Sequence, residues 1–193
     1  CLAIEIDQSR IERRIEHRYL DRWTKDIDEA IKWVTDAKLT ETPLSVGLLG
    51  NAAQLVPELA KRGLEAELVS DQTSAHDPLI GYLPLGMGIE EADELRANDK
   101  AAYLKAVGES MATHVRGMLA FLAKGSHVFD YGNNLRAGAQ ERGPDDHRRR
   151  RGVRDHHDPA RGRLPVQPAA LRHRRHELVH QRRQPAVAGA RPD

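Results

Sequence analysis

Cysteine and long apolar runs are scarce in this sequence of 193 residues. Its single cysteine is Cys1, so the chain can form neither an internal disulfide nor a zinc site built on cysteines. No stretch approaches the roughly 18 apolar residues that a membrane span requires, and no charged segment followed by an apolar one opens the sequence. We therefore expect a cytoplasmic protein without a membrane partner.

Residues 144–193 lack aromatic residues, isoleucine and lysine. They contain three Leu, four Val, 13 Arg and six acidic residues, with a net charge of +7. A segment with so few large apolar side chains cannot bury a core. Residues 1–143 hold all eight aromatic residues and a net charge of −6. We therefore predict one folded domain over residues 1–143, followed by a disordered tail rich in Arg, Pro and His.

Two hypotheses account for the tail. An abrupt loss of Lys, Ile and aromatic residues, with a rise in Arg, Pro and His, is what a shifted reading frame in a GC-rich gene would produce. Alternatively, an arginine-rich arm could neutralise nucleic-acid phosphates. Because the tail has no aromatic residues to stack on bases and six acids interrupt its basic runs, a nucleic-acid partner is disfavoured.

Strands and helices are predicted to alternate along residues 1–143. Short runs rich in apolar residues predict buried strands at residues 1–7, 44–49, 65–70 and 127–129. Helices are predicted over residues 10–19, 26–38, 51–63 and 98–124. Pro57 should bend the third helix or mark a late start, and Asn98 should cap the fourth. The pattern indicates an α/β domain with a mostly parallel sheet and flanking helices, whose ligands bind beyond the carboxyl ends of the strands.

Two polar features directly follow predicted strands. Glu5 ends the first strand, where a dinucleotide-binding fold often holds an acid against a ribose hydroxyl; a solvated acid is the alternative. Gly50, Asn51 and Ala52 form the turn between a strand and a helix, where free N–H groups attract an anion or a polar cofactor edge. A plain turn explains these three residues equally well.

A third feature is the long loop predicted over residues 71–88. Its first part, residues 71–78, has the sequence DQTSAHDP, which packs poorly and suits a polar lining; long loops of this kind are usually functional or disordered. His76 with Asp77 or Ser74 could form a hydrolase constellation, but the sequence has no GxSxG elbow. No two histidines of residues 1–143 have helical metal-ligand spacing. We expect neither a hydrolase nor a metal site.

Four motifs together resemble the urocanase (urocanate hydratase) family. In chain order they are DQTSAHDP at residues 71–78, GYLP at 81–84, Ser110-Met111 with His114-Val115, and FDYGNN at 129–134. The similarity runs from Cys1 to about Gly143. It implies a Rossmann-like domain with tightly bound NAD⁺ used as an electrophile, and addition of water to urocanate to give 4-imidazolone-5-propionate in histidine degradation. It also implies a homodimer.

The resemblance also implies which residues contact NAD⁺. Glu5 and Arg10 would hold the adenosine side. Further contacts would come from the turn after the second strand, from the long loop and from the segment after the fourth strand: Asn51, Ala52, Gln72, Thr73, Ser74, Ala75, His76, Tyr82, Leu83 and Tyr131.

The chain also departs from the family pattern. The family's glycine-rich first turn would precede Cys1, and its catalytic cysteine would lie beyond the segment of Tyr131, in a region that this chain does not reproduce. Cys1 begins a strand before Glu5 and is not that cysteine. We therefore expect the central cofactor-binding part of a urocanase, truncated at the N-terminal side of its sheet and inactive alone, with its catalytic residues unknown. A dinucleotide- or nucleotide-binding module whose partner supplies any chemistry is the alternative.

Overall fold

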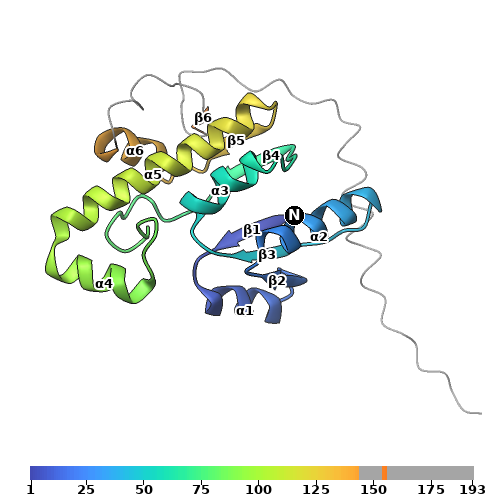
Figure 1. The fold of residues 1–193 in the computed structure, drawn as a ribbon, viewed down its shortest axis with the longest axis horizontal. Coiled ribbons are helices and arrows are strands. Elements are labelled where there is room, and N and C mark those ends of the chain that lie inside the picture. The colour runs from blue at the N-terminus through green and yellow to red at the C-terminus, as the bar shows by residue number, and fades with distance from the viewer. Residues whose placement is uncertain (144–153, 156–193) are drawn as a thin grey trace, which may run out of the picture. The chain divides into compact units, whose positions relative to one another are not determined.

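Strands and helices alternate along the chain in the computed structural model, which describes residues 1–143 and 154–155 (Figure 1). In chain order, the elements are β1 (Leu2–Glu5), α1 (Gln8–Glu16), β2 (Arg22–Thr24), α2 (Ile27–Leu39), β3 (Val46–Leu49), α3 (Ala52–Lys61), β4 (Leu68–Asp71), α4 (Ile89–Asn98), α5 (Lys100–Ala123), β5 (His127–Asp130), α6 (Leu135–Arg142) and β6 (Arg154–Asp155). Apart from β6, the predicted tail lies outside the described residues.

Every strand pair among the described residues is parallel, which confirms the predicted α/β arrangement of parallel strands and flanking helices. The strands form two three-stranded sheets rather than one, in the orders β1-β3-β2 and β4-β5-β6. Glu5 pairs with Leu49 at the end of the first sheet, and Asp71 pairs with Asp130 in the second. Residues that follow paired parallel strands therefore emerge at a common edge.

Side-chain caps begin several helices. The Asp26 carboxylate accepts hydrogen bonds from the N–H groups of Asp28 and Glu29 at the start of α2, as favourable capping requires. Asn51 caps α3 and Asp99 caps α5. The prediction that Asn98 caps the long helix is wrong, because this residue ends α4.

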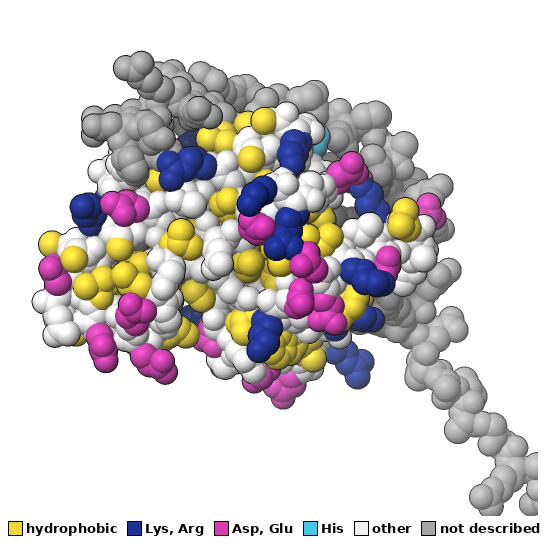
Figure 2. Space-filling model, in the orientation of Figure 1, with side chains coloured by type: hydrophobic (Ala, Val, Ile, Leu, Met, Phe, Trp, Pro, Cys, Tyr) yellow, Lys and Arg dark blue, Asp and Glu magenta, His cyan; other side chains and the backbone are white. Residues whose placement is uncertain are grey.

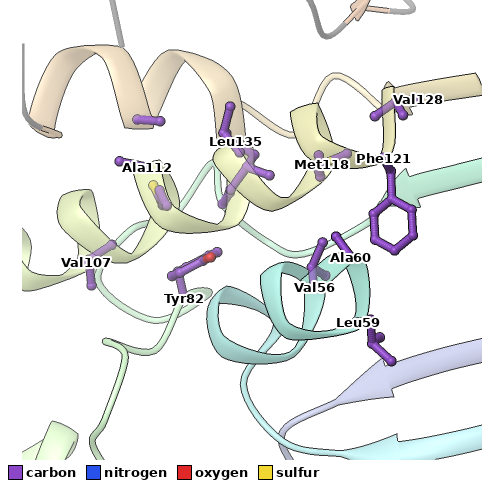
Figure 3. Packing of buried hydrophobic residues seen from close by; sticks show 14 of the residues in the cluster. Val56, Leu59, Ala60, Tyr82, Val107, Ala112, Met118, Phe121, Val128 and Leu135 are labelled. Atoms are coloured by element: carbon purple, nitrogen blue, oxygen red, sulfur yellow. The ribbon is translucent and has the colours of Figure 1, made fainter. Parts of the chain in front are cut away.

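Helix α5 is the main packing element of the core and lies between α3 and α6 (Figure 1). Figure 3 shows Val56 and Ala60 on the side of α3 that faces α5. Pro57 lies inside α3, so the alternative of a late helix start is wrong. A Cβ atom on Gly117 of α5 would lie 2.6 Å from the Pro57 nitrogen. Glycine at this position therefore allows the two helices to approach closely.

Four elements were not predicted from the sequence: β2, α4, α6 and β6, which lies in the predicted tail. Strand β2 has only three residues, and α4 buries only Ala92 among its ten residues. Helix α6 follows Asn134, which has a left-handed backbone with φ of +66°. None of these segments has the extended apolar period on which the prediction depended.

Charge is distributed rather than concentrated on the face of the described residues that Figure 2 shows, where basic and acidic side chains are interspersed with hydrophobic ones. Within residues 1–143 and 154–155, no helix is both long enough and apolar enough to cross a membrane.

Candidate functional site

The carboxyl end of the first sheet brings Glu5 close to the start of α3. Glu5 is the last residue of β1, and its carbonyl oxygen accepts a hydrogen bond of 2.9 Å from the Gly50 N–H. Gly50 directly precedes Asn51, the cap of α3. Two of the predicted features, the acidic residue that ends β1 and the turn that begins α3, thus lie at one edge of the sheet.

The Glu5 carboxylate is held in place by basic and backbone donors. Oε2 accepts from Arg14 Nη1 at 2.8 Å, and Oε1 accepts from the Ile6 N–H at 3.0 Å. The Glu5 side chain is 15% exposed. Arg14 is a residue that the sequence analysis missed, although it lies one helical turn after Arg10. Arg10 itself is exposed, with Nε 3.4 Å from Asp7 Oδ2.

The side chain of Asn51 connects α3 to the long loop. Its Oδ1 accepts a hydrogen bond from the Ala53 N–H at 2.9 Å, which caps the helix. Its Nδ2 donates to the carbonyl oxygens of Leu83 at 3.1 Å and Pro84 at 3.2 Å. Ala52 is the first residue of α3 and is half-buried. The amide of Asn51 therefore joins two of the predicted contact segments.

Exposed polar side chains alternate along the first part of the long loop. Gln72, Ser74 and His76 are exposed, whereas Thr73 is half-buried and Ala75 is buried. Alternation of this kind places the three polar side chains on the solvent side and the other two toward the protein. The predicted lining thus consists of a row of amide, hydroxyl and imidazole groups.

A buried carboxylate ties this loop to the one that follows β5. Asp71 Oδ2 accepts from the Thr73 hydroxyl at 2.9 Å and also from Asn133 Nδ2. Asn133 Nδ2 additionally donates to the Thr73 carbonyl oxygen at 2.8 Å. Tyr131 lies between β5 and Asn133 and is 51% exposed, with its ring 5.4 Å from that of Phe129.

The middle of the long loop folds back on itself. The Asp77 N–H donates to the Ser74 carbonyl at 3.0 Å, and the Gly81 N–H donates to the Asp77 carbonyl at 2.8 Å. A Cβ atom on Gly81 would lie 2.1 Å from the Ser74 carbonyl oxygen, so only glycine fits this approach. The polar row is thereby fixed next to the segment that contains Tyr82 and Leu83.

Tyr82 is buried rather than exposed as part of a polar lining. It is 5% exposed, and Figure 3 shows its ring beneath α5. Its hydroxyl lies 3.1 Å from His114 Nδ1. Burial raises the pKa of Tyr82 well above its usual value, and the charge of Asp71 adds to this. Burial also lowers the pKa of His114, which Asp71 partly opposes. Tyr82 therefore keeps its proton and His114 is neutral, and the two side chains share one hydrogen bond.

The predicted contact residues thus form two groups, one at the end of each sheet. The first contains Glu5, Arg10, Asn51 and Ala52 at the first sheet and the start of α3. The second lies along the long loop and after β5, and comprises Gln72, Thr73, Ser74, Ala75, His76, Tyr82, Leu83 and Tyr131. The hydrogen bond from Asn51 to Leu83 joins the groups. Contact of these residues with a cofactor stays a prediction.

The chemistry of the two groups suits a ligand with both hydroxyl and anionic parts. A carboxylate accepts hydrogen bonds from sugar hydroxyls, and the N-terminus of a helix attracts an anion. Within the described part of the chain, no three His, Cys, Asp or Glu side chains are grouped to hold a metal ion.

A comparison with protein-family models bears on this arrangement. The model described as the urocanase Rossmann-like domain matches residues 1–153. The match covers all the elements from β1 to α6 and both groups of predicted contact residues. It extends beyond Gly143, where the resemblance seen in the sequence ends. The chain therefore belongs to the urocanase family, and its residues 1–153 match the Rossmann-like domain of that family.

Proposed function

We propose that this chain binds NAD⁺ at the carboxyl ends of its two parallel sheets, as the cofactor-binding part of a urocanate hydratase. The observation that carries the proposal is the position of Glu5. Glu5 ends β1, and its backbone carbonyl oxygen accepts from the Gly50 N–H directly before α3. An acidic residue and the start of a helix thus share the carboxyl edge of the sheet, where a Rossmann-like fold receives a ribose and an anionic group.

The residues at this edge fit a dinucleotide by their chemistry. Each oxygen of the Glu5 carboxylate can accept more than one hydrogen bond, so it can bind a ribose hydroxyl while Arg14 holds it. Gln72, Ser74 and His76 offer donors and acceptors on the exposed side of the loop. Tyr131 offers a half-exposed aromatic ring, which suits a flat heteroaromatic group.

We take the reaction of the whole enzyme from the resemblance to the urocanase family. When bound, NAD⁺ supplies an electrophile for the imidazole ring of urocanate, and water is added to give 4-imidazolone-5-propionate. The residues of this chain would bind and orient the cofactor, with Asn51, Asn133 and His114 holding the loops that surround it. A role in histidine degradation and a homodimer are predictions of the same resemblance, and a cytoplasmic location is a prediction from the sequence.

Calorimetric titration of the full chain with NAD⁺ tests the proposal. We expect saturable binding with one site per chain. Glu5→Gln removes the carboxylate charge and should weaken binding about tenfold, as expected for a hydrogen bond to a charged group. Glu12→Gln is the matched control, because Glu12 is an exposed acid on α1 whose Oε1 accepts from Gln8 Nε2.

A second pair of variants tests the aromatic contact. Tyr131→Ala should weaken NAD⁺ binding, whereas Tyr19→Ala should leave it unchanged. Tyr19 is also exposed, and it lies by Cys1 at the opposite end of β1. Absence of binding to the unchanged chain, or equal effects of the two substitutions, would overturn the proposed site.

Titration with ADP-ribose distinguishes a urocanase cofactor site from the nucleotide-binding form of the alternative. A urocanase cofactor site should bind NAD⁺ more tightly than ADP-ribose, because the nicotinamide ring contributes contacts. A nucleotide-binding module that recognises only the adenosine side would bind both ligands equally.

A further inference from the structure

Three polar side chains form a stripe along one side of α5, within its buried surface. Tyr103, Ser110 and His114 are spaced by seven and four residues, so they lie on the same face of the helix. They are 0%, 3% and 3% exposed. None of these three residues is a predicted NAD⁺ contact, and none of them caps a helix.

All three side chains bind the same short segment, residues 82–85. The Tyr103 hydroxyl donates to the Tyr82 carbonyl oxygen at 3.0 Å. The Ser110 hydroxyl oxygen accepts from the Leu85 N–H at 2.7 Å, and it donates back to Ala106 O in its own helix at 2.7 Å. His114 Nδ1 lies 3.1 Å from the Tyr82 hydroxyl.

A fourth contact holds this segment from the other side. Asn51 Nδ2 donates to the carbonyl oxygens of Leu83 and Pro84. The backbone groups of residues 82–85 are thus fixed between the start of α3 and the middle of α5. A segment without regular secondary structure is held at four consecutive residues, which a plain connecting loop does not require.

We propose that Tyr103, Ser110 and His114 are positioning residues for the dinucleotide site, acting through residues 82–85. This inference rests on the proposed function. Because Tyr82 is buried, it cannot offer its ring to a ligand at the surface, and the segment would contribute backbone atoms and the half-buried Leu83. The stripe holds these atoms in one arrangement before the ligand arrives, which avoids the cost of ordering them on binding.

Single-hydroxyl variants of the full chain test the inference. Tyr103→Phe and Ser110→Ala each remove one hydroxyl group from the stripe. Thr113→Ala is the matched control, because the Thr113 hydroxyl lies on the same helix and bonds to Glu109 O and Arg116 rather than to residues 82–85. Titrations are made well below the unfolding temperature of each variant, so that all the protein is folded.

We expect Tyr103→Phe and Ser110→Ala to raise the dissociation constant for NAD⁺ about three- to tenfold, the loss of one neutral hydrogen bond. Thr113→Ala should leave it unchanged. His114→Asn retains a hydrogen-bonding group near the position of Nδ1 and should keep most of the affinity that His114→Leu loses. A purely structural role would lower the unfolding temperature without changing the dissociation constant, and that result overturns the proposal.

Amide hydrogen exchange in the absence of NAD⁺ separates this proposal from the proposed function. Exchange of the Leu85 N–H should become faster in Ser110→Ala and in Tyr103→Phe but not in Thr113→Ala. Unchanged exchange would overturn the claim that the stripe holds the segment. If the unchanged chain binds no NAD⁺, the proposed function and the ligand assigned to the stripe both fall, while the exchange rates still decide whether the segment is held.

Discussion

Replacement of Asn51 by alanine should destabilise the protein more than the loss of a helix cap alone. The substitution removes the cap on the Ala53 N–H and both hydrogen bonds to the long loop. A cap contributes about 1 kcal/mol and each neutral hydrogen bond about 0.5–1.5 kcal/mol. Pro84 is fully buried, so its carbonyl has little access to water as a replacement partner. We therefore expect a loss of about 2–4 kcal/mol in the free energy of unfolding.

A second helix supplies the comparison. Asp26 caps α2 through the N–H groups of Asp28 and Glu29, and it is exposed. Asp26→Ala should cost about 1 kcal/mol, since only a cap is lost. Serine caps a helix nearly as well as Asn or Asp, so Asp26→Ser should be close to neutral. Asn51→Ser keeps the cap but not the two loop contacts, and should still cost about 1–3 kcal/mol.

Urea unfolding of the full chain, followed by circular dichroism, measures these differences. All variants should show the same dependence on urea concentration, which would indicate the same unfolding reaction. Equal losses for Asn51→Ala and Asp26→Ala, together with a neutral Asn51→Ser, would refute the reasoning. That result would mean that the contacts to Leu83 and Pro84 contribute nothing to stability.

Three further predictions concern Gly81 in the long loop, the buried His114 and the activity of the chain. Gly81→Ala should cost about 2 kcal/mol or more in urea unfolding, because its Cβ would meet the Ser74 carbonyl, whereas Gly88→Ala has open space and should change stability by less than about 0.5 kcal/mol. The unfolded chain protonates His114 near pH 6.5 and the folded chain only at lower pH, so unfolding free energy should fall by up to about 1.4 kcal/mol per pH unit below 6.5; His114→Leu should remove this slope, and an unchanged slope would exclude the buried neutral imidazole. The chain mixed with NAD⁺ and urocanate should leave the ultraviolet absorbance of urocanate unchanged, and a steady loss of absorbance would show that it is catalytically complete.

The alternation of strands and helices was predictable because it depends on local patterns. The apolar spacing and the cap at Asp26 are sufficient to locate α2, and the run of small and apolar residues at Val46–Leu49 marks a strand buried between two neighbours. Helix α4 was not predictable in this way, because only Ala92 among its ten residues is buried and the segment has no apolar period. Its position depends on packing against α5, which the sequence does not reveal.

The positions of the candidate site were predictable from the sequence, but the hydrogen-bond partners of its side chains were not. A strand followed by Gly50 and Asn51 indicates a turn at a ligand edge, yet nothing local indicates that the Asn51 amide donates to Leu83, which is 32 residues away. The polar stripe on α5 could have been predicted from the sequence. Tyr103, Ser110 and His114 share one face of a helix whose neighbouring positions are apolar. Polar residues on a buried face require partners.

Chemical-shift mapping by NMR tests the central claim most directly. On addition of NAD⁺ to the isotopically labelled chain, we expect the backbone amide signals of both contact groups to shift in a saturable way. The largest changes should fall on Glu5–Asp7, on residues 50–53, on residues 72–76 and 82–85, and on Tyr131. Shifts confined to the opposite ends of the strands, or no shifts at any concentration, would contradict the assignment of this edge as the NAD⁺ site.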